Sequence, residues 1–158
     1  MAEQVSHHPP ISAFYAEGKG YYSYGNTNVK QNFWGSSIEF KCIGLKHTIL
    51  TDTNEHITIK RPENSANNLI IGTLYIDVHG IVEVHNVTKN IKAVIDISRQ
   101  NWSNRTPFGF TGKITDQYDN VKMLVEGTWN KDYYLKDPLT GVKEKIFTAD
   151  VRPANSAR

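Results

Sequence analysis

The stretch TLYIDVHGIVEVH, residues 73–85, decides the fold because apolar and polar residues alternate along it. Successive side chains of a β-strand point to opposite faces of a sheet, so this alternation predicts strands with one apolar face. Leu74, Ile76 and Val78 are expected on one face, and Asp77 and His79 on the other. The same period recurs at residues 57–60, 94–97 and 123–126.

Turn-forming residues separate the alternating segments at intervals of about 8 to 12 residues, a spacing typical of sequential hairpins. They occur at positions 18–20, 52–54, 79–80, 88–90, 116–120 and 137–141. We therefore expect an all-β antiparallel meander of about nine or ten strands that forms a partial, incomplete β-barrel. Little helix is expected beyond a short turn near residues 98–104.

The composition is that of a single globular domain over residues 1–158, with an ordered core at 3–150 and a frayed tail at 152–158. The net charge of +2 is too small to favour a nucleic-acid partner. We expect no transmembrane helix and no secretory leader. Cys42 has no second cysteine to pair with, which favours a reducing, cytoplasmic setting.

A partial barrel leaves two edge strands and one apolar face uncovered. Unpaired backbone groups along an edge strand invite pairing with another chain. We therefore expect a homodimer, or a larger self-association, through the open β edges or the apolar face.

The octapeptide EQVSHHPP, residues 3–10, is the second informative feature. Pro9 and Pro10 fix φ and lack a backbone N–H, so the chain after His7 and His8 is stiff and extended. Two imidazoles on a stiff support lose little freedom on binding, and their ring nitrogens all become donors on protonation. A phosphate suits this arrangement. The alternatives are a pair of ordinary surface histidines and a metal site, although nothing at zinc-site spacing supports a metal.

The octapeptide also resembles the fingerprint of the oxysterol-binding protein family of lipid-transfer proteins. All of its positions match, and the residues that follow at 11–14 are usual there. Weaker similarities occur at NFWGSS (32–37), at NLIIG (68–72) with Gly80, and at GTW (127–129). The resemblance spans residues 3–130.

This resemblance implies a large, incomplete antiparallel barrel around a hydrophobic tunnel that takes a sterol, another lipid, or the acyl chains of phosphatidylinositol 4-phosphate. Members exchange such lipids between membranes, and the fingerprint histidines bind the phosphoinositide head group, a role that carries over to His7 and His8. We expect the chain to be the central part of such a domain, without the lid and the further basic ligands, and to act at the membrane periphery.

Four aromatic residues are candidates for lipid contact at the tunnel wall or mouth: Phe14, Tyr15, Phe33 and Trp34. Tyr and Trp favour places with one apolar and one wet side, although strand residues that line a core carry the same side chains. No cofactor motif and no catalytic motif is recognised, so we expect no enzyme. The alternative function is a β-rich interaction or self-association module that has lost lipid transfer.

Phosphoinositide binding through these histidines should depend on pH. Imidazole titrates near pH 6.5, and a bound anion favours its charged form, so affinity should rise as the pH falls from about 7.5 to about 6. A binding titration across that range checks this. An affinity that is independent of pH would count against the histidines as ligands.

Overall fold

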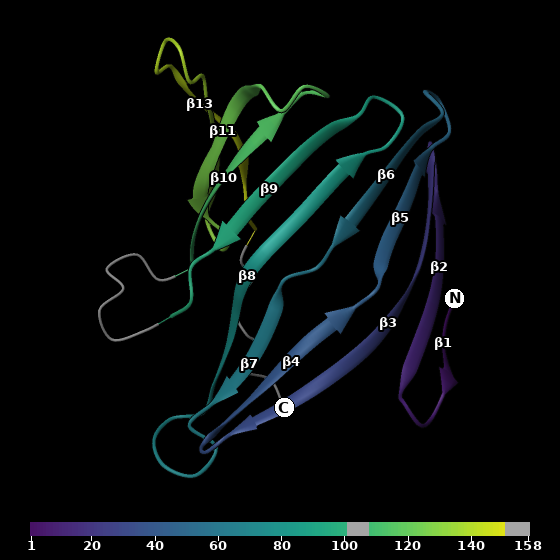
Figure 1. Ribbon diagram of the computed structural model, residues 1–158, viewed down its shortest axis with the longest axis vertical. Helices are drawn as coiled ribbons and strands as arrows, with labels where there is room; N and C mark the ends of the chain where they lie inside the picture. Colours follow the sequence, from purple (N-terminus) through teal and green to yellow (C-terminus); the bar gives the residue numbers. More distant parts are fainter. Residues whose placement is uncertain (101–107, 151–158) are drawn as a thin grey trace.

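The computed structural model describes residues 1–100 and 108–150, which form one antiparallel sheet without a helix (Figure 1). The all-β prediction is confirmed. The strands are β1 (Ala2–Ser6), β2 (Ile11–Gly18), β3 (Tyr21–Trp34), β4 (Ser37–Ile43), β5 (Leu45–Leu50), β6 (Glu55–Lys60), β7 (Glu63–Asn67), β8 (Tyr75–Asn86), β9 (Ile91–Ile97), β10 (Gly109–Thr115), β11 (Val121–Thr128), β12 (Asp132–Lys136) and β13 (Lys143–Thr148).

The expected count of nine or ten strands is wrong, because the sheet has 13. Short strands account for the difference. β7 reads ENSAN and is too short and too polar to show a two-residue hydrophobic period. Within the expected turn at 98–104, residues 98–100 form no helix. The rest of that turn and the tail at 152–158 lie outside the described residues.

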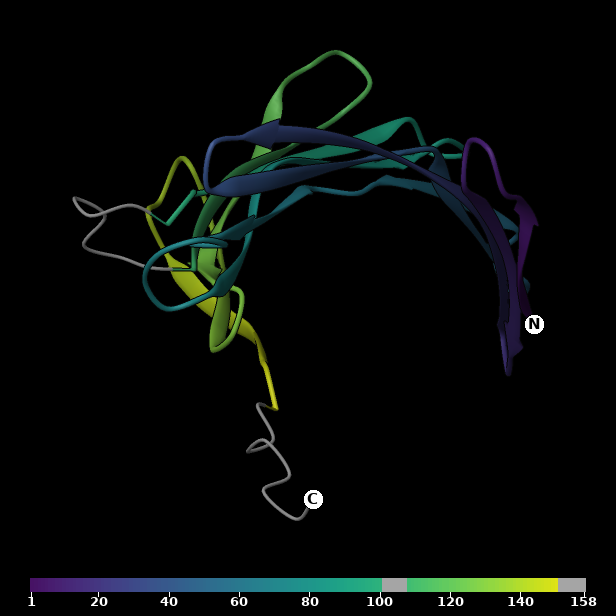
Figure 2. The same ribbon diagram turned by 90° about the horizontal axis from the view of Figure 1, so that it is seen from below.

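The sheet curves into an open arch, with β1 at one end of the strand order and β13 at the other (Figure 2). Neither edge strand pairs with a further strand among the described residues. This confirms the partial barrel. None of the described elements is a helix long and apolar enough to cross a membrane.

Two long strands, β3 and β8, organise the sheet because each pairs with two shorter strands on the same side. β3 pairs with β5 along residues 21–25 and with β4 along 28–34. β8 pairs with β7 along residues 75–79 and with β6 along 83–86. The pairs β5–β6 and β4–β7 therefore lie end to end between β3 and β8, and we call the junction between them the seam (Figure 1).

Gly80 lies where β8 changes partner from β7 to β6, so the turn expected at residues 79–80 is wrong. Its φ of 88° is accessible to glycine without a steric penalty. The chain uses this freedom to continue through the partner change as one strand. A turn-forming residue thus marks an irregularity within a strand and not its end.

The apolar face of the arch is open, so few apolar side chains are fully covered. Among the described residues, the buried apolar side chains are Ala66, Phe110 and Val125. Phe110 and Val125 also line a hollow of about 230 Å³, together with Val82, Ile95, Ile97, Trp129 and Tyr133. Ile76 is 63% exposed, whereas Asp77 on the opposite face is only 2% exposed. The alternation separates the two faces as expected, but at this point the polar face is the covered one.

Substitution of Gly112 should destabilise the central strand β10. An alanine Cβ there would lie 2.5 Å from the carbonyl oxygen of Val94 and 2.9 Å from the Cα of Ile95. Backbone atoms yield little, so Gly112→Ala should lower the free energy of unfolding by about 1–3 kcal/mol. Urea denaturation measures this, with the exposed Thr111→Ala as the control. Equal urea midpoints for the two variants would contradict this prediction, because they would show that β9 accommodates the added methyl group without loss of stability.

Candidate functional site

His7 and His8 occupy the turn between β1 and β2, at residues 7–10, and both are exposed. Their ring centroids lie 5.1 Å apart with the rings inclined at 63°. The His8–Pro9 peptide bond is cis. The turn therefore presents two neighbouring imidazoles to solvent in different orientations, which suits several oxygen atoms of one anion better than a flat ligand.

Gln4, on β1, orients His7. Its amide nitrogen donates to the carbonyl oxygen of Ser6 at 3.0 Å and lies 3.3 Å from Nδ1 of His7. Because an amide N–H only donates, Nδ1 of the neutral ring accepts, and the ring proton is on Nε2. Nε2–H is then free to donate to a ligand. Sequence reasoning missed this role, although Gln4 belongs to the same octapeptide.

Phe14 and Tyr15 lie further along β2 and not beside the histidines. Phe14 is half-buried, and Tyr15 is 45% exposed. The Tyr15 hydroxyl donates to Glu17 at 3.2 Å, and partial burial together with this carboxylate raises the pKa of Tyr15. Tyr15 also begins a row of stacked rings that continues through Tyr22, Tyr24, His47 and His56.

Phe33 and Trp34 end β3, at the same end of the sheet as the histidine turn (Figure 1). Ile11, which follows the turn, pairs with Asn28, five positions before Phe33 along β3. At about 3.3 Å per residue, Phe33 lies roughly 17 Å along the strand from that point. The predicted site residues therefore do not form one cluster, although the histidines and this aromatic pair share an end of the sheet.

The end of β3 and the β7–β8 connection together form an exposed surface that we call the apolar rim. Its members are Phe33 (69% exposed), Trp34 (66%), Leu69 (42%), Ile70 (75%), Ile71 (82%) and Leu74 (59%). The backbone N–H of Leu69 donates to the carbonyl oxygen of Ser36 at 2.9 Å, which ties the two segments together. Residues 68–72, one of the segments that resemble the family, thus form part of a connection between two strands. In the sequence, the uncharged run LIIGTL at residues 69–74 could have predicted this part of the apolar rim.

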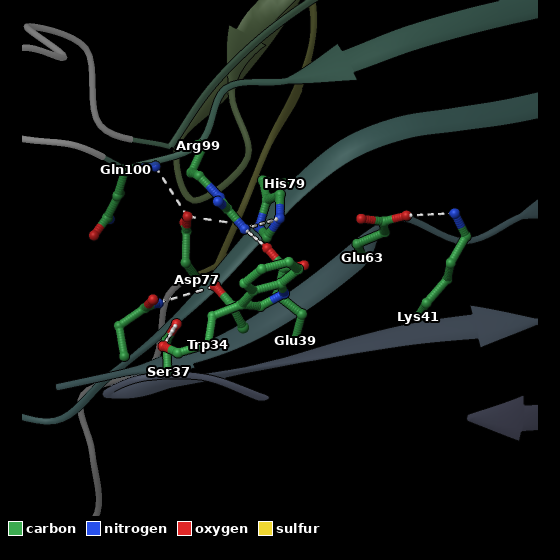
Figure 3. Close-up of polar contacts among 11 residues, drawn as sticks. Trp34, Ser37, Glu39, Lys41, Glu63, Asp77, His79, Arg99 and Gln100 are labelled. Carbon is green, nitrogen blue, oxygen red and sulfur yellow. Dashed lines mark hydrogen bonds and ion pairs between the residues drawn. The ribbon is translucent and has the colours of Figure 1, made fainter. Parts of the chain in front are cut away.

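A polar network lies near β8 on the polar face of the sheet, the face that carries Asp77 and His79 (Figure 3). The sequence did not predict this network. The backbone N–H of Gln100 donates to Asp77 at 2.9 Å, and Arg99 donates to Nε2 of His79 at 2.9 Å and to Glu39. His79 is 7% exposed. Its Nδ1 lies 3.6 Å from Asp77, and since the guanidinium only donates, Nε2 of His79 accepts. The network holds residues 99–100 against β4 and β8.

Glu39 makes this network sensitive to acid. The hydrogen bond from Arg99 lowers the pKa of Glu39 despite the opposing effect of partial burial. A lowered carboxylate pKa stabilises the fold above the usual glutamate value of about 4.3, and this contribution disappears as the pH falls through the lower folded value.

Glu39→Gln should therefore reduce stability at neutral pH and have a smaller effect near pH 3, below the usual glutamate pKa, where the stabilisation that comes from a lowered pKa is declining. Urea midpoints at the two pH values measure the difference. Glu144→Gln, at an exposed position on β13, is the control. An equal loss for Glu39→Gln at both pH values would show that the ionised form of Glu39 has no stabilising role.

The part of the chain that the structure describes holds no group of three or more His, Cys, Asp or Glu residues placed to bind a metal ion. The histidine turn and the apolar rim are therefore considered as candidate surfaces and not as a metal centre.

Comparison with known proteins places this geometry in a family. The family model described as "Oxysterol-binding protein" matches residues 1–157. Oxysterol-binding protein 11 of Dictyostelium discoideum is 31% identical over 145 residues, which cover 92% of this chain and 25% of that protein. Oxysterol-binding protein-related protein 1 of Mus musculus is 34% identical over 142 residues, which cover 89% of this chain and 15% of that protein.

Two solved structures are similar in fold. The Osh1 ORD domain in complex with ergosterol aligns with a TM-score of 0.82 at 24% identity, over 97% of this chain and 41% of that one. The Osh3 ORD in complex with PI(4)P from Saccharomyces cerevisiae aligns with a TM-score of 0.78 at 28% identity, over 94% and 39%.

The chain thus spans a quarter or less of these two curated relatives and about two fifths of the two solved domains. The match of the family model over nearly the whole sequence agrees with the octapeptide and with the open β-arch. The chain belongs to the oxysterol-binding protein family.

Proposed function

We propose that this chain is part of a lipid-binding domain that binds a phosphoinositide by its head group and takes part in lipid transfer between membranes, without catalysis. The observation that carries the proposal is the exposed histidine pair at the same end of the sheet as the apolar rim. The complexes of related domains with ergosterol and with PI(4)P support these two ligand classes.

The head group would bind at the β1–β2 turn. Gln4 contacts Nδ1 of His7, so Nε2 is the nitrogen through which this ring would donate, and the ring centroid of His8 is 5.1 Å away. Hydrogen bonds between a charged donor and a phosphate oxygen are shorter and stronger than neutral ones, so protonated imidazoles are the better ligands. Two imidazoles form a minimal site, to which cationic ligands elsewhere in a larger domain would add.

The lipid body would lie against the apolar face of the arch. The hollow near Phe110 and Val125 is almost entirely apolar in its lining residues, as sites for hydrocarbon are. Sterols and acyl chains offer few polar groups, so burying their apolar area supplies most of the binding free energy. The open arch itself provides a concave surface but not a closed tunnel (Figure 2).

The apolar rim would touch the membrane, as a cytoplasmic protein that acts at the membrane periphery would require. Large exposed apolar patches on soluble domains mark interaction surfaces, and Trp favours the interface between water and lipid. Ile70 and Ile71 project most, at 75% and 82% exposed. Their approach to a bilayer would bring the histidine turn at the same end of the sheet toward the lipid head groups.

A second proposal is self-association, because β1 and β13 are edge strands. The hydrogen-bonding groups on the outer sides of these strands could pair with a second copy. β13 is exposed along its whole length. Analytical ultracentrifugation would show a dimer or a larger species, and a concentration-independent monomer would contradict this proposal.

Liposome co-sedimentation tests the main proposal. Wild type should bind vesicles that contain phosphatidylinositol 4-phosphate more strongly than vesicles without it. His7→Ala/His8→Ala should remove this difference, because the phosphate donors are lost. Ile70→Asp/Ile71→Asp should weaken binding to both kinds of vesicle, because the rim would no longer enter the interface.

Leu139→Asp is the matched control for the rim variant. Leu139 is 94% exposed on a different turn, between β12 and β13, so its substitution should leave vesicle binding unchanged. Equal binding of wild type and the double histidine variant to phosphoinositide vesicles would contradict head-group recognition at the turn. Unchanged binding by the isoleucine variant would contradict membrane contact through the rim.

A further inference from the structure

One row of directly opposed residues crosses the apolar face of the arch from β2 to β11. Residues opposite one another on neighbouring strands point to the same face, so the strand register defines such a row. Its members are Phe14, Gly25, Lys46, Ile59, Val84, Ala93, Ile114 and Met123. The row lies on the face that carries the apolar hollow, because Val82, which lines that hollow, is two positions before Val84 on β8. Every side chain of the row is apolar except that of Lys46.

Lys46, on β5, is half-buried and has no ion pair or side-chain hydrogen bond among the described residues. The residues directly opposite it, Gly25 and Ile59, offer no side-chain acceptor. Nearby on the same face, the hydroxyls of Ser23 and Thr48 lie 2.8 Å apart and bond to each other. Lysine is rarely buried unless its ammonium is paired, so an unpaired cation in an apolar row is a feature that the fold itself does not use.

A lipid on the apolar face would change the surroundings of this charge. In the open arch, water can hydrate the ammonium at the end of the apolar lysine stem. A lipid that covers the row would displace this water, and burying a charge without a partner is costly. A carboxylate or phosphate at the end of the lipid would offset that cost by a charge-assisted hydrogen bond, whereas a neutral hydroxyl would offset less of it.

The position of Lys46 relative to the hollow suits a long hydrocarbon chain. The hollow is lined from β9 by Ile95 and Ile97, and β6 and β8 lie between β9 and β5 (Figure 1). Three intervals of about 4.8 Å between neighbouring strands give roughly 14 Å from β5 to β9. An extended chain would therefore lie across β6 and β8, with its apolar end in the hollow and its polar end at Lys46.

We propose that Lys46 makes the apolar face select lipids with an anionic end, a carboxylate or a phosphate, over lipids that end in a neutral hydroxyl. The inference rests on the proposed function, since it requires a lipid body on this face. It is independent of head-group recognition at the histidine turn, because Lys46 lies within the sheet on β5 and not at the β1–β2 turn.

Equilibrium dialysis of the chain against oleate and against oleyl alcohol measures this selectivity. The two probes share one hydrocarbon chain, and the carboxylate is ionised at about pH 8. Wild type should bind oleate about tenfold more tightly than the alcohol, the effect of one hydrogen bond between charged groups. Lys46→Met should bind both probes equally, because methionine keeps an apolar stem without the ammonium. Lys46→Arg should restore the preference, because it keeps the charge.

Lys113→Met is the matched control. Lys113 precedes Ile114 on β10 and therefore points to the polar face, and it too has no ion pair among the described residues. Its substitution should leave the preference for oleate unchanged, as should His7→Ala/His8→Ala. Urea midpoints of the variants check that each one is folded. A preference for oleate that persists in Lys46→Met, or that disappears in the histidine variant, would overturn the proposal.

A third probe, oleoyl lysophosphatidic acid, separates a phosphate end from a carboxylate end. Tighter binding of both acids than of the alcohol indicates that charge alone is recognised, and tighter binding of one acid identifies that group as the ligand. Equal binding of all three probes by wild type would overturn selection by Lys46 but leave lipid binding by the apolar face intact. Binding of none of them would contradict that proposed lipid-binding face and the inference with it.

Discussion

Backbone pairing of β3 and β8 with two short strands each is the constraint on which the rest of the structure depends. One side of a long strand can pair with two partner strands only if one partner ends where the other begins. The meeting point must then be closed by other means, and Arg61 closes it by donating across the seam to β3. Positive φ at Gly44 and Gly80 lets the backbone change direction there.

The same pairing determines where the candidate surfaces lie. Because β3 continues past β5 to pair with β4, its far end carries Phe33 and Trp34 beyond the histidine turn. Because β8 first pairs with β7, the connection before it returns to the end of β3, where Leu69 bonds to Ser36. One end of the arch therefore carries two kinds of chemistry, imidazole donors and exposed hydrocarbon. The proposed binding of a phosphoinositide at a membrane surface rests on this combination.

The sequence predicts the fold class well because two-residue alternation is a local property. It predicts less where a feature depends on residues that are distant in sequence. The network on the face of Asp77 joins Glu39 to Arg99, and no local pattern signals that these residues meet. Asp77 is buried beside this network, where it accepts a hydrogen bond from the backbone of Gln100. This is why the polar face of β8 is covered at that point. The histidine pair was recognisable because its motif is contiguous, but an extended chain was expected there and not the turn at residues 7–10, and Gln4 acquires its role only from the shape of that turn.

The network and the seam show two ways in which one sheet can accommodate charge. At the network, Glu39 and Asp77 accept hydrogen bonds from Arg99 and from the backbone of Gln100, so these carboxylates have donors nearby. At the seam, Arg61 donates to the backbone of Asn26 and to the hydroxyl of Thr27, and the nearby carboxylates of Glu63 and Glu83 are engaged by exposed lysines. Both arginines therefore fasten segments that are distant in sequence, Arg99 through a carboxylate of β4 and Arg61 through the backbone of β3.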